Sequence, residues 1–292
     1  MDILSEITDH KRIEVELQKQ AVSPEQLREQ VRDLMENSPA PRRSMKRALA
    51  SSPAGIIAEF KRRSPSKGWI YETAKADEIP AAYKAAGASA ISILTDEKFF
   101  GGSLRDIRTA RPLVDIPILR KDFIIDEYQL LQARIAGADA VLLIAACLTQ
   151  EECADLTARA HALGLEVLLE IHSPRELAYI SKDVDMVGVN NRNLGTFVTD
   201  VENSFRIAGQ LRQTIADARN IPDAQGSSDT PRNLPLLVSE SGISHPETIC
   251  RLRTAGFRGF LIGETFMKTP QPGDALKGFI QGIEETEAQK SL

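Results

Sequence analysis

Lysine and glutamate side chains interrupt the apolar segments of this sequence, mostly where a segment ends. These positions carry Glu59 and Lys61, Lys121, Glu170, Asn190 and Arg192, and Glu240. A lysine flanked by carboxylates stays protonated and can act as an acid, whereas a glutamate against apolar walls can have a raised pKa and donate a proton. If the fold brings these side chains together, they would form a pocket suited to acid–base chemistry.

Any one of these charges could instead face solvent at the end of its segment. Glu59 argues most strongly against that alternative, because it lies inside the apolar run 56–60 and a buried glutamate is rare without a partner. Several such residues at one edge of a fold are harder to explain by solvation than a single one.

Eight short apolar segments, alternating with amphipathic ones, predict the elements that carry these residues. The predicted strands are Ile56–Phe60, Ala90–Leu94, Ile118–Arg120, Ala140–Ile144, Val167–Glu170, Met186–Val189, Leu236–Val238 and Gly259–Ile262. Nearly continuous apolar runs are typical of parallel strands buried on both faces. Helical stretches lie between them, for example 126–136, 150–163 and 246–255, and an Ala-Gly turn before an apolar strand recurs at 86–93, 136–143 and 255–262.

This pattern predicts an α/β protein, either a doubly wound sheet or a closed barrel. Eight strand–helix units favour a (β/α)8 TIM barrel, which takes about 250 residues. In such a barrel the carboxyl ends of all eight strands meet at one rim, and the polar residues named above all lie at or just beyond that end of a strand. Ser241–Gly242 and Gly263–Glu264 follow the seventh and eighth strands, where barrels commonly bind phosphate with backbone N–H groups, and Gly allows the close approach.

Two segments lie outside this repeat. Residues 1–50 predict an N-terminal helical extension, helical over 2–36 with a second helix opening at Ser23–Pro24. A free tail or dimer arm and a lid packed on the barrel of residues 51–292 are both compatible with it; we expect the packed arrangement. Residues 218–233, rich in Gly, Ser and Pro, predict a mobile surface insertion on the face opposite the site.

Composition and motifs exclude several classes of function. The formal charge of −5 with scattered Lys and Arg gives no nucleic-acid footprint, and no apolar run approaches the ~20 residues of a membrane span. Cys147, Cys153 and Cys250 form no metal-binding pair, which favours a reducing cytoplasm. Phosphate-loop, dinucleotide and serine-hydrolase motifs are absent, and of four isolated histidines only His172 lies near a strand end. We therefore expect no metal, no nucleic acid and no membrane partner.

Six segments together resemble the indole-3-glycerol-phosphate synthase family. They are IAEFKRRSPSKG at 57–68, LRKDFI at 119–124, LLEIH at 168–172, GVNNRNL at 188–194, SESGI at 239–243 and LIGE at 261–264. The resemblance covers residues 2 to 285, and its first segment is highly specific. It implies a TIM-barrel carboxy-lyase of tryptophan biosynthesis that needs no cofactor. Its substrate would be the sugar phosphate 1-(2-carboxyphenylamino)-1-deoxyribulose 5-phosphate, and its products indole-3-glycerol phosphate, CO2 and water.

The resemblance also implies roles for individual residues. Lys121 would protonate the ketone oxygen and Glu170 would serve as acid or base in the dehydration, with Lys61 as an electrostatic partner or second acid. Glu59 and Asn190 would orient the substrate, and Glu240 would position the lysines. Ser64 and Arg192 would lie near the substrate carboxylate, and Phe100, Phe123 and Leu142 would surround its aromatic ring. The phosphate would bind to Ser241, Gly242, Gly263 and Glu264. Family members carry Ser or Glu at position 264, so only its backbone is expected to bind.

Two alternatives stay open to test. A barrel isomerase acting on phosphoribosylanthranilate would need a Cys or Asp acid–base pair where this chain has Glu59 and Lys61. A catalytically silent phosphate-binding barrel would keep Gly242 and Gly263 but would have no need of the lysines. A monomer is the expected state, with a dimer through residues 2–36 as its alternative.

Overall fold

The computed structural model describes residues 3–37, 43–193, 195, 198–219 and 234–290. Eight parallel strands form one closed barrel in the order β1-β10-β9-β8-β7-β6-β5-β4, with β1 and β4 closing the ring. These strands are β1 (Ile56–Phe60), β4 (Ala90–Leu94), β5 (Ile118–Lys121), β6 (Ala140–Ile144), β7 (Glu166–Ile171), β8 (Met186–Asn190), β9 (Leu236–Glu240) and β10 (Gly259–Ile262). The predicted fold class is confirmed, and each predicted strand matches an observed one to within two residues at either end.

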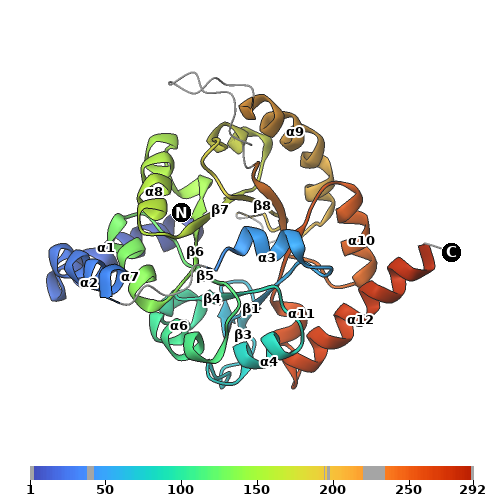
Figure 1. Cartoon of the computed structure of the whole chain (residues 1–292), viewed down its shortest axis with the longest axis horizontal. Coiled ribbons are helices and arrows are strands. Elements are labelled where there is room, and N and C mark those ends of the chain that lie inside the picture. Colours follow the sequence, from blue (N-terminus) through green and yellow to red (C-terminus); the bar gives the residue numbers. More distant parts are fainter. Residues whose placement is uncertain (1–2, 38–42, 194, 196–197, 220–233, 291–292) are drawn as a thin grey trace.

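Helices surround the barrel as an outer ring (Figure 1). They are α4 (Ile79–Ala85), α6 (Leu104–Ala110), α7 (Glu127–Ala136), α8 (Gln150–Ala162), α9 (Glu202–Arg219), α10 (Pro246–Thr254) and α12 (Pro272–Lys290). A six-residue 3-10 helix, η3 (Pro174–Tyr179), follows β7 in place of a longer α-helix. The shorter elements are the helices α5 (Glu97–Phe100) and α11 (Glu264–Met267), the 3-10 turns η1 (Arg111–Leu113) and η2 (Ala145–Cys147), and a hairpin of β2 (Arg63–Ser64) and β3 (Gly68–Trp69).

Side chains that alternate along each strand divide the core into two parts. On β6, Ala140, Leu142 and Ile144 face the barrel interior, whereas Val141 and Leu143 pack under the outer helices. This is the period-two alternation of a strand whose two faces are both buried. The strand exits therefore point their inward-facing residues into the space above the interior core.

Three N-terminal helices precede β1: α1 (Ile3–Ala21), α2 (Pro24–Asn37) and α3 (Met45–Ser51). Val15 of α1 and Leu27 and Val31 of α2 pack with Tyr128 and Leu131 of α7. Within the predicted insertion, residues 218–219 are the last two of α9, and 220–233 lie outside the described residues. In the described part of the chain, every helix is too short or too polar to span a bilayer.

Helix α3 closes the amino-terminal end of the barrel (Figure 1). Its Met45 and Leu49 join the interior core. Ser44 caps the helix by accepting from the Arg47 N–H at 3.0 Å, and its hydroxyl donates to Glu166 at the start of β7. Helix α3 is thus fixed to the barrel through Ser44, which caps the helix and bonds to the Glu166 carboxylate.

Ser44→Ala should lower the free energy of unfolding by about 1–2 kcal/mol, because it removes the cap and leaves the half-buried Glu166 carboxylate with one hydrogen bond fewer. Urea unfolding followed by circular dichroism would measure the change. Ser51→Ala is the matched control, since Ser51 is exposed at the other end of α3 and bonds only to its own helix. Equal losses in both variants would contradict the role given to the cap.

Candidate active site

A cavity of about 580 Å³ opens at the carboxyl ends of the barrel strands. Thirteen residues predicted as site residues line it: Glu59, Lys61, Ser64, Phe100, Lys121, Phe123, Glu170, Asn190, Arg192, Ser241, Gly242, Gly263 and Glu264. The volume lies in the range of small-molecule sites. Predicted residues from six of the eight strand exits and from α5 therefore share one space.

Glu59 and Lys61 form the first lysine–glutamate pair of the cavity. The Lys61 Nζ atom lies 2.6 Å from Glu59 Oε1, and the Glu59 side chain is about 5% exposed. Burial alone would raise the pKa of Glu59, but the ammonium groups of Lys61 and Lys121 outweigh it and hold that pKa below its ordinary value. Gly263 makes room for the carboxylate, because a Cβ there would lie 2.2 Å from Glu59 Oε1.

Lys121 and Glu170 form the second pair, from β5 and β7. Lys121 Nζ lies 3.7 Å from Glu170 Oε2. Burial would lower the pKa of Lys121, but the carboxylates of Glu170, Glu59 and Glu240 raise it above its ordinary value. Burial would raise the pKa of Glu170, yet Lys121 and His172 lower it well below the usual range. The site therefore holds a protonated lysine against an ionised glutamate.

Glu240 lies beneath the cavity and is not one of its lining residues. Its side chain is fully buried, and burial together with the negative charge of Glu170 raises its pKa well above the ordinary value. Gly188 on the neighbouring β8 leaves space for it, since a Cβ there would lie 2.0 Å from Glu240 Oε1. The glutamate with a raised pKa that the sequence led us to expect is thus Glu240, and it supports the floor of the site.

His172 contacts Glu170 from the side opposite Lys121. Its Nε2 atom lies 3.3 Å from Glu170 Oε1, and its Nδ1 lies 3.8 Å from Glu176 Oε2. Burial lowers the pKa of His172, but the two carboxylates outweigh it and raise that pKa to about 9. The imidazole is therefore cationic at neutral pH and holds Glu170 in its charged form. Its place two residues after Glu170 was the sequence signal.

The charge of His172 predicts a pH dependence of stability. Because its pKa is about 9 in the folded chain and near 6.5 when unfolded, its contribution is complete below pH 6.5 and is lost as the pH rises through 9. The excess unfolding free energy of wild type over His172→Gln should fall by up to about 3 kcal/mol across that window. Urea titrations at pH 6 and pH 9.5 would measure it; a difference that grows with pH would contradict this assignment.

The loop after β8 brings Arg192 across the mouth of the cavity. Asn190 Oδ1 accepts from the Arg192 N–H at 3.0 Å, and the Arg192 guanidinium donates to Ser66 Oγ at 3.2 Å. It also lies 3.7 Å from Glu264 Oε2, and Lys67 pairs with the same carboxylate. Glu264 therefore presents its side chain to the cavity mouth, whereas the sequence led us to expect its backbone alone.

Apolar side chains form the opposite wall. Phe100 and Phe123 lie with ring centroids 6.0 Å apart, and both line the cavity. Leu142, predicted beside them, is instead buried in the barrel interior; Ile144, two residues further along β6, lines the cavity in its place. The prediction chose the right face of the strand but the layer below the cavity, because a sequence pattern does not show how high each strand stands in the barrel.

Helix α1 contributes three lining residues that sequence reasoning did not assign: Ile3, Leu4 and Ile7. The helical spacing of these residues was visible, but it does not identify what they face. Other unassigned lining residues are Pro65, Ser66, Lys67, Leu94, Ile144, Thr199, Ile243, Ser244, Leu261, Ile262, Thr265 and Lys268.

The loops after β9 and β10 form the remaining end of the cavity. Ser241 and Gly242 both have a left-handed backbone, with φ of 69° and 80°. The Asn191 side chain donates to the Ser241 carbonyl at 3.0 Å and so holds this uncommon turn. A Cβ at Gly242 would lie 2.6 Å from Thr199 Cγ2, which explains the glycine.

Among the residues that the structure describes, no group of three or more His, Cys, Asp or Glu side chains is arranged to hold a metal ion. The charged and amide groups that line the cavity are four lysines, an arginine, three glutamates and an asparagine. Such a set can bind anions, donate protons and accept them.

A family model described as indole-3-glycerol phosphate synthase matches residues 4–221. A protein from Bacteroides thetaiotaomicron named indole-3-glycerol phosphate synthase is 68% identical over 97% of this chain and 99% of its own length. One of the same name from Magnetococcus marinus is 40% identical over 94% of this chain and 97% of its own.

A solved structure, tryptophan synthase subunit alpha from Legionella pneumophila, is similar in fold. It superposes with a TM-score of 0.56 over 84% of this chain and all of its own, at 16% sequence identity. At that identity the likeness supports the barrel architecture alone.

Proposed function

The chain belongs to the indole-3-glycerol phosphate synthase family and is an enzyme of that activity. We propose that the cavity at the mouth of its barrel binds 1-(2-carboxyphenylamino)-1-deoxyribulose 5-phosphate. Ring closure, decarboxylation and dehydration convert this compound to indole-3-glycerol phosphate, CO2 and water. The observation that best supports the site is the presence of two lysine–glutamate pairs in one cavity, between an aromatic wall and a glycine-containing turn.

We propose that the two ends of the cavity bind the two ends of the substrate. The aromatic ring would lie against Phe100 and Phe123, where apolar contact replaces water. The phosphate would lie against the turns of Ser241–Gly242 and Gly263–Glu264. Lys61, with Arg192 and Ser64, would face the substrate carboxylate, because their cationic and hydroxyl groups line the same cavity.

Ring closure requires the ring carbon that carries the carboxylate to attack the ketone carbon. We assign Lys121 as the acid that protonates the ketone oxygen as the bond forms, because its raised pKa keeps it charged until the oxygen becomes basic. Asn190 and Glu59 would orient the new hydroxyl. Loss of CO2 then leaves its electron pair in the ring system.

Dehydration needs a base at the carbon beside the nitrogen and an acid for the leaving hydroxyl. We assign Glu170 as the base, because Lys121 and His172 keep it ionised, and Lys61 as the acid. Glu240 would act through Glu170 and Lys121 as a positioning residue from the floor. Each step would thus use one residue of the Lys61–Glu59 pair and one of the Lys121–Glu170 pair.

The direct test is indole fluorescence on mixing purified protein with the anilino-deoxyribulose phosphate. Wild type should form a product with the indole emission and release one CO2 per turnover, without any added cofactor. Binding of the compound without indole or CO2 release would reject the activity, and would favour the silent phosphate-binding barrel instead.

Three further properties are proposed. The enzyme would act as a monomer. Three free cysteines fit a reducing cytoplasm. Residues 1–50 would act as an extension that completes the catalytic barrel of residues 51–292, because Ile3, Leu4 and Ile7 reach the cavity. Size-exclusion chromatography with light scattering would measure the oligomeric state.

A further inference from the structure

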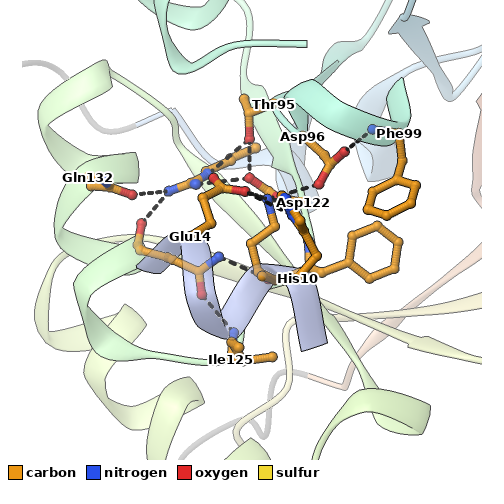
Figure 2. Close-up of polar contacts among 12 residues, drawn as sticks. His10, Glu14, Thr95, Asp96, Phe99, Asp122, Ile125 and Gln132 are labelled. Atoms are coloured by element: carbon orange, nitrogen blue, oxygen red, sulfur yellow. Dashed lines mark hydrogen bonds and ion pairs between the residues drawn. The ribbon is translucent and has the colours of Figure 1, made fainter. Parts of the chain in front are cut away.

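A buried ammonium group joins α1 to the barrel rim outside the site described above. The Lys11 side chain is 1% exposed, and its Nζ atom lies 2.8 Å from Glu14 Oε2, 2.9 Å from Asp96 Oδ2 and 3.0 Å from Asp122 Oδ1. Figure 2 shows these three carboxylates gathered around one point, with Thr95 beside them. Asp96 follows β4 and Asp122 follows β5, so one charge connects three elements.

Stability alone does not explain such a group. The cost of removing charges from water offsets much of the attraction within a buried ion pair, and apolar replacements are often neutral or stabilising. What a buried charge with fixed partners can provide is a defined geometry. The role of Lys11 therefore depends on which parts of the structure its carboxylate partners hold in place.

Asp122 connects Lys11 to the acid of the reaction. It directly follows Lys121, and its Oδ1 also accepts from the Phe123 N–H at 2.9 Å. Its Oδ2 accepts from the Thr95 hydroxyl at 2.6 Å, while the Thr95 N–H donates to the Lys121 carbonyl at 3.1 Å. The backbone from the Lys121 carbonyl to the Phe123 N–H is thus held by Asp122 and by Thr95, which donates to Asp122.

Asp96 connects Lys11 to the aromatic wall. Its Oδ1 accepts from the Phe99 N–H at 2.8 Å and so caps α5, the four-residue helix that ends in Phe100. Lys11 pairs with the other oxygen of the same carboxylate. The orientation of Phe100 in the cavity therefore depends on a carboxylate fixed from two sides.

The helix that carries Lys11 completes the enclosure. Ile7 lies one turn before Lys11 and is buried, and Ile7 lines the cavity together with Ile3 and Leu4. Because residues four apart share a helix face, the ammonium anchors the same face that covers the cavity. The Lys11 side chain thus sets the positions of α1, the aromatic wall of Phe100 and Phe123, and Lys121 relative to one another.

We propose that Lys11 is a positioning residue for the reaction, holding α1, Phe100 and Phe123 around the aromatic end of the substrate and Lys121 at its ketone. This rests on the proposed function of the cavity. The phosphate end, built on β9 and β10, has no part in the Lys11 contacts. The effect of Lys11 should therefore be confined to one end of the cavity.

Two variants test the proposal without relying on a protein that fails to fold. Lys11→Met keeps most of the length of the side chain but leaves the buried Asp96 and Asp122 carboxylates with Arg120 as the one cation that pairs with them among the described residues. Lys11→Met combined with Asp96→Asn removes one of those negative charges, and the Asn oxygen can still cap α5. Lys19→Met is the matched control, because Lys19 also ties α1 to the barrel, through Asp126, but away from the cavity.

The double variant should melt cooperatively, with kcat lowered about 10- to 100-fold, the cost of a small misplacement of reacting groups. Inhibition by N-methylanthranilate, a probe of the aromatic end, should weaken at least about five-fold, whereas inhibition by glycerol 3-phosphate should stay within about two-fold. Lys19→Met should match wild type in its melting, in kcat and in inhibition by both compounds.

Equal weakening of both inhibitors, unchanged kcat, or an equal loss in Lys19→Met would overturn the proposal. Absence of indole formation by wild type would reject the proposed function instead, and direct binding of the same two compounds, measured by calorimetry, would still report on Lys11.

Discussion

Lys121→Ala is expected to lower kcat for indole formation by about 10³-fold or more while the protein stays folded. The ammonium is the group placed to protonate the ketone oxygen, and the carboxylates of Glu170 and Glu59 keep it charged. Its removal withdraws both the proton and the positive charge at the step that forms the carbon–carbon bond. Release of CO2 should therefore fall in parallel with indole fluorescence, because decarboxylation follows ring closure.

Two companion variants sharpen this experiment. Lys121→Arg keeps a positive charge but is a much weaker acid, so it should recover little activity if proton donation is the role of Lys121. Lys75→Ala removes an exposed lysine on the surface, paired with Glu78, and should behave as wild type. Near-complete activity in Lys121→Arg would contradict the assignment of Lys121 as an acid and would leave it an electrostatic role.

The barrel could be predicted from sequence because its strands are buried on both faces. Their apolar runs stand out against amphipathic helices, and parallel strands place every exit at one rim. Glu59, Lys121 and Glu170 could be placed together on that reasoning alone, before any family resemblance. The resemblance added what geometry does not contain: which substrate the pocket takes and which lysine acts first.

Helix α1 shows what the sequence pattern could not provide. Its apolar residues include Ile13 and Leu17, yet their side chains are 61% and 59% exposed, while Lys11 is buried. Hydropathy assigns a lysine to solvent, and it does so correctly unless carboxylates from distant segments meet it inside the fold. Asp96 and Asp122 lie far from Lys11 in sequence, so their convergence is a property of tertiary structure.

For the same reason, the sequence could not show which residue of a strand reaches the cavity, or how neighbouring charges shift the pKa of each glutamate. Leu142 and Ile144 share one face of β6, and only the closed barrel decides which of them reaches the cavity. Glu170 and Glu240 are the same residue type at equivalent strand exits. Their pKa values shift in opposite directions because Lys121 and His172 lie closer to Glu170, which leaves Glu240 to take the proton.

Glu170→Gln should lower kcat for indole formation by about 10²- to 10³-fold, through a different step from Lys121→Ala. Gln keeps the size of the side chain and its hydrogen-bonding oxygen, but it is not a base. Because Glu170 is assigned to dehydration, which follows the loss of CO2, a single turnover of this variant should release CO2 well before indole fluorescence appears.

Rapid-quench measurement of CO2 beside stopped-flow fluorescence would resolve the two signals. In Lys121→Ala both should be slow together, whereas in Glu170→Gln they should separate, and that contrast distinguishes a general loss of binding from loss of one step. If CO2 and indole fall by the same factor in Glu170→Gln, the glutamate acts at ring closure. In that case its charge would serve Lys121, 3.7 Å away, and not the carbon that loses its proton.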